Sequence, residues 1–110
     1  MRPAPLQDEV WLVQLDPTYE AEMKKPRPCL VVSPNDMNEN LRTVVIAPMT
    51  AKVRPFLSRV QVRFRGKSGQ IALDQIKTVD SQRLQRKLGK VSAATGEAAS
   101  KILIQMFSRS

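Results

Sequence analysis

Four polar side chains at the ends of apolar segments could carry chemistry: Glu22, Arg27, Thr50 and Asp74. The chain has no histidine, so the side chain that most often acts as general base near neutral pH is missing. A carboxylate is the base that remains, and Glu22 is the candidate. Arg27 keeps its positive charge and can bind two phosphate oxygens at once, while the Thr50 hydroxyl can donate one more hydrogen bond. This combination suits cleavage of an RNA phosphodiester by the neighbouring 2′-hydroxyl.

In that reaction the base takes the proton of the ribose 2′-hydroxyl, and hydrogen-bond donors stabilise the pentacoordinate phosphate. The products are a 2′,3′-cyclic phosphate and a 5′-hydroxyl. The acid that protonates the leaving 5′-oxygen stays open between Arg27, Asp74 and water. Cys29, the one cysteine, lies in an apolar run, where a small buried hydrophobic residue is a better interpretation than a nucleophile.

Each candidate also has a purely structural interpretation. Glu22 fits a solvated loop charge, and Arg27, which precedes Pro28, fits an anchor at a strand edge. Thr50 is an ordinary β-branched strand residue. Asp74 fits a hydrogen-bond acceptor on the polar side of a sheet. Residue type alone therefore does not decide between structure and catalysis.

The elements that must position these side chains are short. Apolar and β-branched runs predict strands over 10–15, 29–32, 43–47, 59–65, 70–74 and 87–91, with 77–79 extending the sheet. A polar loop over 16–26, a turn over 33–36 and a basic loop over 51–56 connect them. From 93 to 108 the apolar period becomes helical, and Ser92 is the expected N-cap. The predicted fold is mainly β, a small barrel-like antiparallel sheet with one C-terminal helix packed on it.

Side-chain alternation predicts the buried faces. Along 59–65 one face holds Val60, Val62 and Phe64, and the opposite face holds Arg59, Gln61, Arg63 and Arg65. Along 70–74, Ile71 and Leu73 form one side and Gln70, Ala72 and Asp74 the other. On the helix the apolar stripe is Ala99, Ile102, Leu103 and Met106. Asp80 or Ser81 is expected to cap a short helical turn, and residues 1–9 are expected to form a loose leader.

The charge of the chain is unevenly distributed. The formal net charge is +8 and the isoelectric point is about 10.3. Residues 1–55 contain equal numbers of basic and acidic residues, so the whole excess lies in 56–110. A basic face that binds a polyanion, either a nucleic acid or an acidic protein, is one interpretation, and an ordinary solvated surface is the other.

Several classes of protein are excluded by what the chain lacks. One cysteine excludes a disulfide framework, and no apolar run approaches the roughly 20 residues of a membrane span. The sequence contains no metal-ligand spacing, phosphate-binding glycine loop or Ser/His/Asp set. No cofactor or metal is expected, and the N-terminus lacks a signal-peptide core, so a cytoplasmic protein without membrane contact is expected.

Several motifs keep their order along almost the whole chain. They are the segments 10–18, Glu22, 27–34, 46–50, 69–80, Leu84, 88–89 and the C-terminal helix. This arrangement resembles the MazF/PemK/Kid family of toxin endoribonucleases of type II toxin–antitoxin systems. The resemblance implies one toxin domain over 1–110, with a leader over 1–9, an SH3-like barrel over 10–91 and a helix over 93–108. It also implies a homodimer that cleaves single-stranded messenger RNA at short sequences without a metal.

The resemblance assigns roles to particular positions. Glu22 in the long loop, Arg27 at the start of the second strand and Thr50 at the end of the third would be the active residues. Asp74 matches an acidic residue that one branch of the family uses together with an arginine, where this chain has Ala72. The cations expected to steer the RNA backbone are Lys24, Lys25, Lys52, Arg54, Arg59 and Arg63.

The resemblance also implies partners. Family toxins are inhibited by an antitoxin whose acidic, flexible tail covers the RNA groove, and the toxin–antitoxin complex is expected to bind operator DNA. This chain departs from the family at the N-terminal Arg-Gly-Asp/Glu motif, which reads Gln7-Asp8-Glu9 here. It also has Glu20 in place of the loop glycine, Met23 in place of a glutamine and Ala21 where some members have histidine.

Two other functions suit the same fold. One is a poison of DNA gyrase of the CcdB type, but the sequence 105–110 does not resemble the Trp-Gly-Ile ending of that group. The other is a nucleic-acid-binding module without catalysis, which the basic second half alone would allow.

Overall fold

The structure is a computed structural model, and it describes residues 3–15 and 25–110. The strands are β1 (Glu9–Val13), β2 (Arg27–Val31), β3 (Thr43–Thr50), β4 (Arg59–Phe64), β5 (Lys67–Ala72), β6 (Lys77–Asp80) and β7 (Leu84–Lys90). The helices are α1 (Asn35–Asn40) and α2 (Ala93–Phe107), and two 3-10 turns span Leu73–Gln75 and Ser81–Arg83. In these ranges the chain is mainly β with a C-terminal helix, as the sequence predicts.

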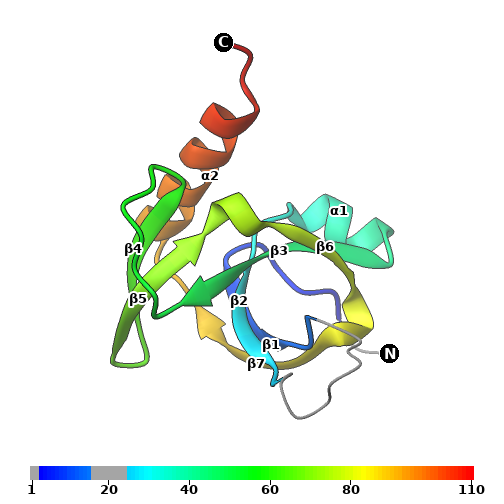
Figure 1. Cartoon of the computed structure of the whole chain (residues 1–110). Helices are drawn as coiled ribbons and strands as arrows, with labels where there is room; N and C mark the ends of the chain where they lie inside the picture. The colour runs from blue at the N-terminus through cyan, green and yellow to red at the C-terminus, as the bar shows by residue number, and fades with distance from the viewer. Residues whose placement is uncertain (1–2, 16–24) are drawn as a thin grey trace.

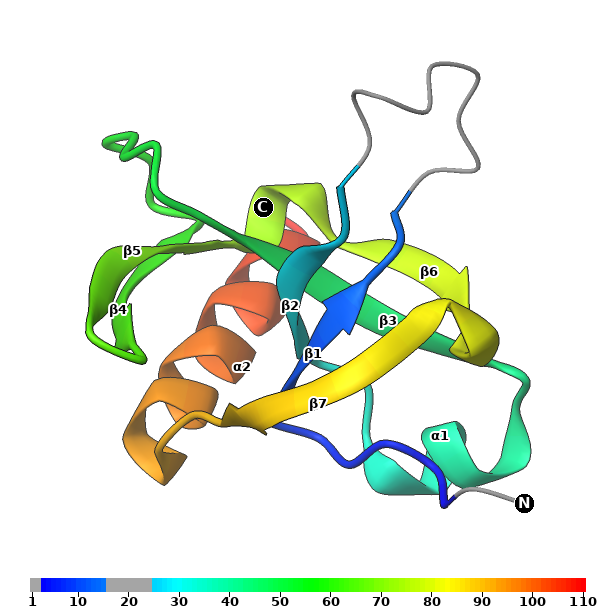
Figure 2. The ribbon, with the colours of Figure 1, turned by 90° about the horizontal axis from the view of Figure 1, so that it is seen from below.

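The described strands form one strongly bent antiparallel sheet (Figure 1). Its order is β4-β5-β3-β2-β1-β7, and β6 also pairs with β3. Strand β3 is the centre of the arrangement, because it pairs with β2 along one edge and with β6 and then β5 along the other. The sheet therefore curls into a half-barrel, and the β4–β5 hairpin extends from its side (Figures 1 and 2).

Two apolar clusters fill the two sides of this sheet. Inside the curl lie Val13, Cys29, Val31, Val44, Ile46, Val79 and Leu84. Against α2 lie Val10, Leu30, Ala47, Val60, Ile71, Leu73, Val91 and Ala99. Neighbouring residues of β2 point into different clusters, which explains why the run at 29–32 lacks polar alternation.

Helix α2 begins as predicted, since the Ser92 hydroxyl oxygen accepts a hydrogen bond from the Thr95 N–H at 3.1 Å. Ala99, Ile102 and Leu103 pack on the sheet, whereas Met106 is exposed. The reason is that the last turns of α2 extend beyond the sheet they pack on (Figure 1). Met106 is therefore not part of the core of the single chain.

Residues 3–9 are not a loose leader, so that prediction is wrong over the part of it that the structure describes. Asp8 N–H donates to the Val31 carbonyl, the Asp8 carbonyl accepts from Val91 N–H, and Glu9 is buried in β1. Asp8 has a φ of 76°, a left-handed conformation that favours glycine. Its carboxylate packs on Gly96 of α2, so a side chain at position 96 would require the carboxylate to move.

One further prediction needs correction. Helix α1 occupies a segment predicted as a turn, because Pro34 and Asp36 suit a helix start as well as a turn. In β5 both sides are buried at Gln70 and Ala72, because the chain that follows β3 covers the side opposite Ile71 and Leu73. By contrast, the cap at Asp80 is confirmed, since its carboxylate accepts from Gln82 N–H at 2.9 Å.

Neither α1 nor α2 is long and apolar enough to cross a membrane.

Candidate active site

Strands β2 and β3 bring Arg27 and Thr50 to the same end of the sheet. Their antiparallel register pairs Leu30 with Ala47 and Cys29 with Pro48. The pairing ends at Cys29 and Pro48, so Arg27 and Thr50 both lie just beyond its last pair, one on each strand. Both residues stand where the sequence placed them, since Arg27 opens β2 and Thr50 ends β3.

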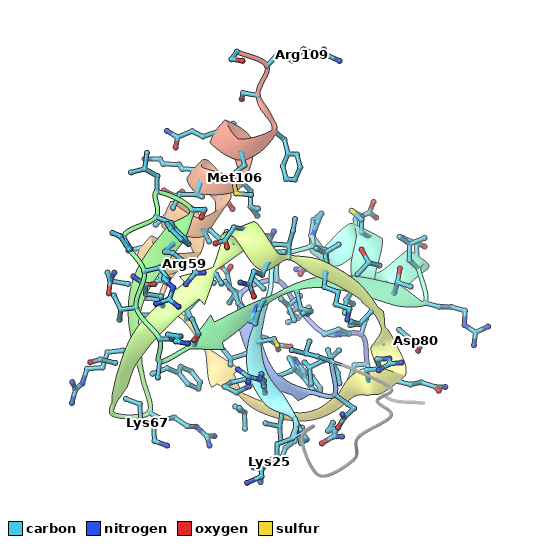
Figure 3. All side chains as sticks on the ribbon, in the orientation of Figure 1. Lys25, Arg59, Lys67, Asp80, Met106 and Arg109 are labelled. Atoms are coloured by element: carbon cyan, nitrogen blue, oxygen red, sulfur yellow. The ribbon has the colours of Figure 1, made fainter. Side chains whose placement is uncertain are left out.

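A groove of about 380 Å³ opens beside these two strand ends. Its lining includes Pro28 next to Arg27, Thr50 itself, and the apolar side chains of Met49, Phe64 and Leu88. Arg65 and Lys67 of the β4–β5 hairpin add positive charge to its rim. In Figure 3, Lys67 and Lys25 both project from the lower edge of the molecule. The groove thus combines an apolar floor with a cationic border, which suits a ligand that carries both flat apolar groups and negative charge.

Thr50 has an orientation fixed by its own loop. It is half-buried, and its Oγ1 accepts a hydrogen bond from the Lys52 N–H at 3.0 Å. A threonine hydroxyl that accepts one bond still has its own hydrogen to donate. Thr50 can therefore give a hydrogen bond to a phosphate oxygen placed at the end of β3.

The chain between β3 and β4, the loop 51–58, carries two of the predicted RNA-binding cations. Lys52 and Arg54 are both exposed. The side-chain amide of Gln70 anchors this loop through two hydrogen bonds, one to the N–H and one to the carbonyl of Arg54. The sequence analysis missed this role, although a glutamine between Gly69 and Ile71 inside an otherwise apolar run was the available signal.

Asp74 and Arg59 form an ion pair at the end of the same loop. Arg59 Nε donates to Asp74 Oδ1 at 2.7 Å, and the Ser58 hydroxyl donates to the same oxygen at 2.8 Å. The Arg59 side chain is only 5% exposed, whereas that of Asp74 is 30% exposed. In the β4–β5 register Arg59 lies opposite Ala72, so its guanidinium reaches Asp74 from the neighbouring strand.

This pairing changes what both residues can do. The hydrogen bond from Arg59, opposed by partial burial and helped by Ser58, lowers the pKa of Asp74 to about 2. Asp74 is therefore ionised near neutral pH and has no proton to give to a leaving oxygen. Arg59, which the sequence grouped with the RNA-binding cations, is instead enclosed and already neutralised.

Of the remaining predicted site residues, two are described by the structure and two are not. Glu22 and Lys24 lie outside the described residues. Lys25 and Arg63 are exposed, and Arg63 also donates to the Ser68 hydroxyl oxygen at 3.4 Å.

Cys29 lies in the core, as its apolar surroundings in the sequence suggest. The side chain is fully buried inside the curl of the sheet. Burial raises the pKa of its thiol to about 12, and the charge of Arg27 opposes this only in part. The thiol is thus protonated near neutral pH and is a poor nucleophile.

No group of three or more Asp, Glu or Cys side chains that could hold a metal ion occurs within 3–15 and 25–110. The chemistry available at the described part of the groove consists of a guanidinium, a hydroxyl, backbone N–H groups and ammonium groups.

Comparison with known proteins identifies the family. The sequence profile of the PemK-like, MazF-like toxins of type II toxin–antitoxin systems matches residues 6–107. The chain is 32% identical over 96 residues to the endoribonuclease MazF9 of Mycobacterium tuberculosis (strain ATCC 25618 / H37Rv), an alignment that covers 78% of this chain and 81% of MazF9. The chain belongs to the PemK/MazF toxin family. The resemblance described from its motifs is thereby confirmed.

Other members of the PemK/MazF family agree with this assignment. The endoribonuclease PemK of Escherichia coli is 36% identical over 80 residues, which cover 66% of this chain and 58% of PemK. Thus the toxin described here is related to two curated endoribonucleases.

Solved PemK/MazF-type structures share the fold. An endoribonuclease from a mycobacterial species, solved in complex with its cognate antitoxin, superimposes with a TM-score of 0.79 at 25% identity and covers 97% of this chain and 100% of its own. A MazE–MazF structure from Deinococcus radiodurans gives a TM-score of 0.81 at 19% identity, with 97% and 99% coverage. The predicted fold class, a small β-barrel with a C-terminal helix, is therefore confirmed.

Proposed function

We propose that this toxin cleaves single-stranded RNA in the groove beside Arg27 and Thr50, by attack of a ribose 2′-hydroxyl on the adjacent phosphate. Glu22 takes the proton of that hydroxyl, Arg27 binds the phosphate oxygens as their charge grows, and Thr50 adds a hydrogen bond. Lys24, Lys25, Lys52, Arg54 and Arg63 hold the RNA backbone. The reaction leaves a 2′,3′-cyclic phosphate and a 5′-hydroxyl and needs no metal.

The observation that carries the proposal is the antiparallel pairing of β2 and β3, which puts Arg27 and Thr50 at the same end of the two strands, where Pro28 and Thr50 line the groove. A guanidinium and a hydroxyl at the same end of two paired strands can contact different oxygens of one phosphate. Asp74 is left out of the proton transfers because its pair with Arg59 keeps it ionised. Arg27 and water are the acids that remain for the leaving 5′-oxygen.

The test is a cleavage assay on a long single-stranded RNA in excess EDTA, with wild type compared with Arg27→Ala and the product ends mapped. We expect discrete cuts with 5′-hydroxyl ends in the wild type and none with the variant. Intact RNA in the presence of folded wild-type protein would overturn the proposal.

The partners proposed are an antitoxin with an acidic tail and a second copy of the chain, acting on messenger RNA in the cytoplasm. The cationic border of the groove supports the first, because an acidic tail would complement Arg65 and Lys67. A bound antitoxin would block RNA there, and the complex is proposed to bind operator DNA. An acidic peptide should therefore inhibit cleavage at low salt and lose that effect as salt rises.

The homodimer is supported by apolar side chains that the single chain leaves in water. Leu57 is 95% exposed and Phe107 70% exposed, and Phe56 and Ile104 are exposed as well. Large apolar side chains exposed to this degree favour burial against a partner. Sedimentation of wild type and Phe107→Ser should show a dimer that the substitution weakens, and a wild-type monomer at micromolar concentration would contradict this.

A further inference from the structure

Gln70 is a polar side chain enclosed by the protein, with 1% of its surface exposed. Its Nε2 donates to the Arg54 carbonyl oxygen and its Oε1 accepts from the Arg54 N–H, both at 3.0 Å. Oε1 also accepts from Arg59 Nη1 at 3.3 Å. The side-chain amide thus binds both backbone polar groups of one residue of the loop 51–58, as a neighbouring strand would.

We propose that Gln70 is a positioning residue of the ribonuclease site: it fixes the loop 51–58 so that Thr50, Lys52 and Arg54 engage the RNA backbone together. The inference rests on the proposed function. In the β3–β5 register Gln70 lies directly opposite Thr50, so the residue that binds the loop is also the cross-strand neighbour of the residue at its start.

Only a glutamine satisfies this position. Binding the N–H and the carbonyl of one residue requires a donor and an acceptor on the same side chain, which a primary amide provides. Asparagine is one methylene shorter, and glutamate lacks the donor at neutral pH. The neighbouring Gly69 lets β5 lie close to the end of β3, because a Cβ at this position would lie 2.6 Å from the Thr50 carbonyl oxygen.

The ion pair at the end of the loop is a second anchor. Asp74 binds Ser58 and Arg59, and the Ser58 carbonyl accepts from Leu73 N–H at 3.1 Å. Since Arg59 also donates to Gln70, the two anchors are joined through one guanidinium. With both ends held, the exposed Lys52 and Arg54 have little backbone freedom to lose when RNA binds, which lowers the entropic cost of binding.

The first experiment measures loop order without RNA. Trypsin can cut after Lys52 but not after Arg54, because Pro55 follows it. In Gln70→Ala, mapped by mass spectrometry, cleavage after Lys52 should be about tenfold or more faster than in wild type, because local opening governs proteolysis. Gln61→Ala is the matched control, since Gln61 is exposed and lies opposite Gln70 on β4. Equal cleavage rates in all three proteins would overturn the proposal.

The second experiment separates positioning from mere stability. For RNA cleavage, Gln70→Ala should raise KM about tenfold and change kcat less, because the loop cations act mainly in binding. Gln70→Glu keeps the acceptor for Arg54 N–H and should lie between Gln70→Ala and wild type. Thermal melts of every variant confirm that the proteins compared are folded.

A mutant cycle links Gln70 to the cations. Replacing Lys52 and Arg54 together with alanine should weaken RNA binding much less in the Gln70→Ala protein than in wild type, because a disordered loop has already lost their joint contact. Equal losses in both backgrounds would show that Gln70 does not act through these residues and would overturn the inference while the ribonuclease assignment stands. A folded wild type that cuts no RNA would overturn the proposed function, whatever the loop does.

Discussion

The two sides of the groove are built in different ways. On one side Arg27 is exposed at the first position of β2 and is placed by backbone pairing, with Val13 as its partner on β1. On the other side the loop 51–58 is placed by side chains, through the amide of Gln70 and the Asp74–Arg59 pair. A strand end held by a backbone ladder tolerates changes in its neighbours. A loop held by buried polar groups depends on each of them.

Replacement of Arg27 is expected to have the largest effect, because it removes the guanidinium itself. Arg27→Ala should lower kcat by about 100-fold or more, the usual cost of losing a donor to a developing charge. Because the side chain is exposed, the melting temperature should stay close to that of wild type. Arg27→Lys keeps the charge without the bidentate geometry and should be intermediate. Wild-type rates in either folded variant would remove Arg27 from the chemistry.

Replacement of Asp74 tests the side of the groove that side chains build, and the quantity measured is the free energy of unfolding. Asp74→Asn leaves the enclosed Arg59 without its anion and should lower the free energy of unfolding by about 2 kcal/mol, measured with urea. Activity should fall only several-fold, because the carboxylate takes no part in proton transfer. If the variant is as stable as wild type but cuts no RNA, Asp74 takes part in catalysis, and the contrast between the two sides of the groove is wrong.

The same residue predicts an acid dependence of stability. The pKa of Asp74 is lowered to about 2 in the folded protein, below its ordinary value. The stabilisation is therefore complete above pH about 4 and is lost as the pH falls toward about 2. Asp74→Asn should unfold with a flatter dependence on pH across this window. Parallel curves for variant and wild type would contradict the pairing.

The smallest effects are expected from the exposed cations. Lys52→Ala and Arg54→Ala should each lower the slope of log affinity for RNA against log salt by about one. Lys101→Ala is the matched control, since Lys101 is exposed on α2. Unchanged slopes for the loop variants, or an equal change in the control, would show that the RNA takes another path.

Sequence patterns predicted the side of the groove that the backbone builds. Apolar runs and turn residues were enough to place β2 and β3, and with them Arg27 and Thr50 at strand ends. Their proximity depends on a register that connects residues far apart in sequence, and only the structure gives it.

The side-chain contacts that place the loop 51–58 could not be predicted from the sequence. Alternation placed Gln70 on the side of the strand opposite Ile71 and Leu73, but it did not indicate that the loop 51–58 covers that side and makes Gln70 a buried partner. Arg59 and Asp74 are 15 residues apart, and nothing in either segment indicates that they pair. For the same reason Arg59 was grouped with the exposed arginines, although its neighbours enclose it. Local pattern predicts strands well and polar networks poorly.

The central claim, cleavage by the 2′-hydroxyl in this groove, is tested most directly with a modified substrate. Once a cut site has been mapped, the same RNA is made with a single 2′-deoxy nucleotide on the 5′ side of the scissile bond. Wild-type toxin should leave that bond intact and still cut a second, unmodified site in the same molecule. Cleavage at the modified bond would contradict the account, because no 2′-hydroxyl would be present to attack.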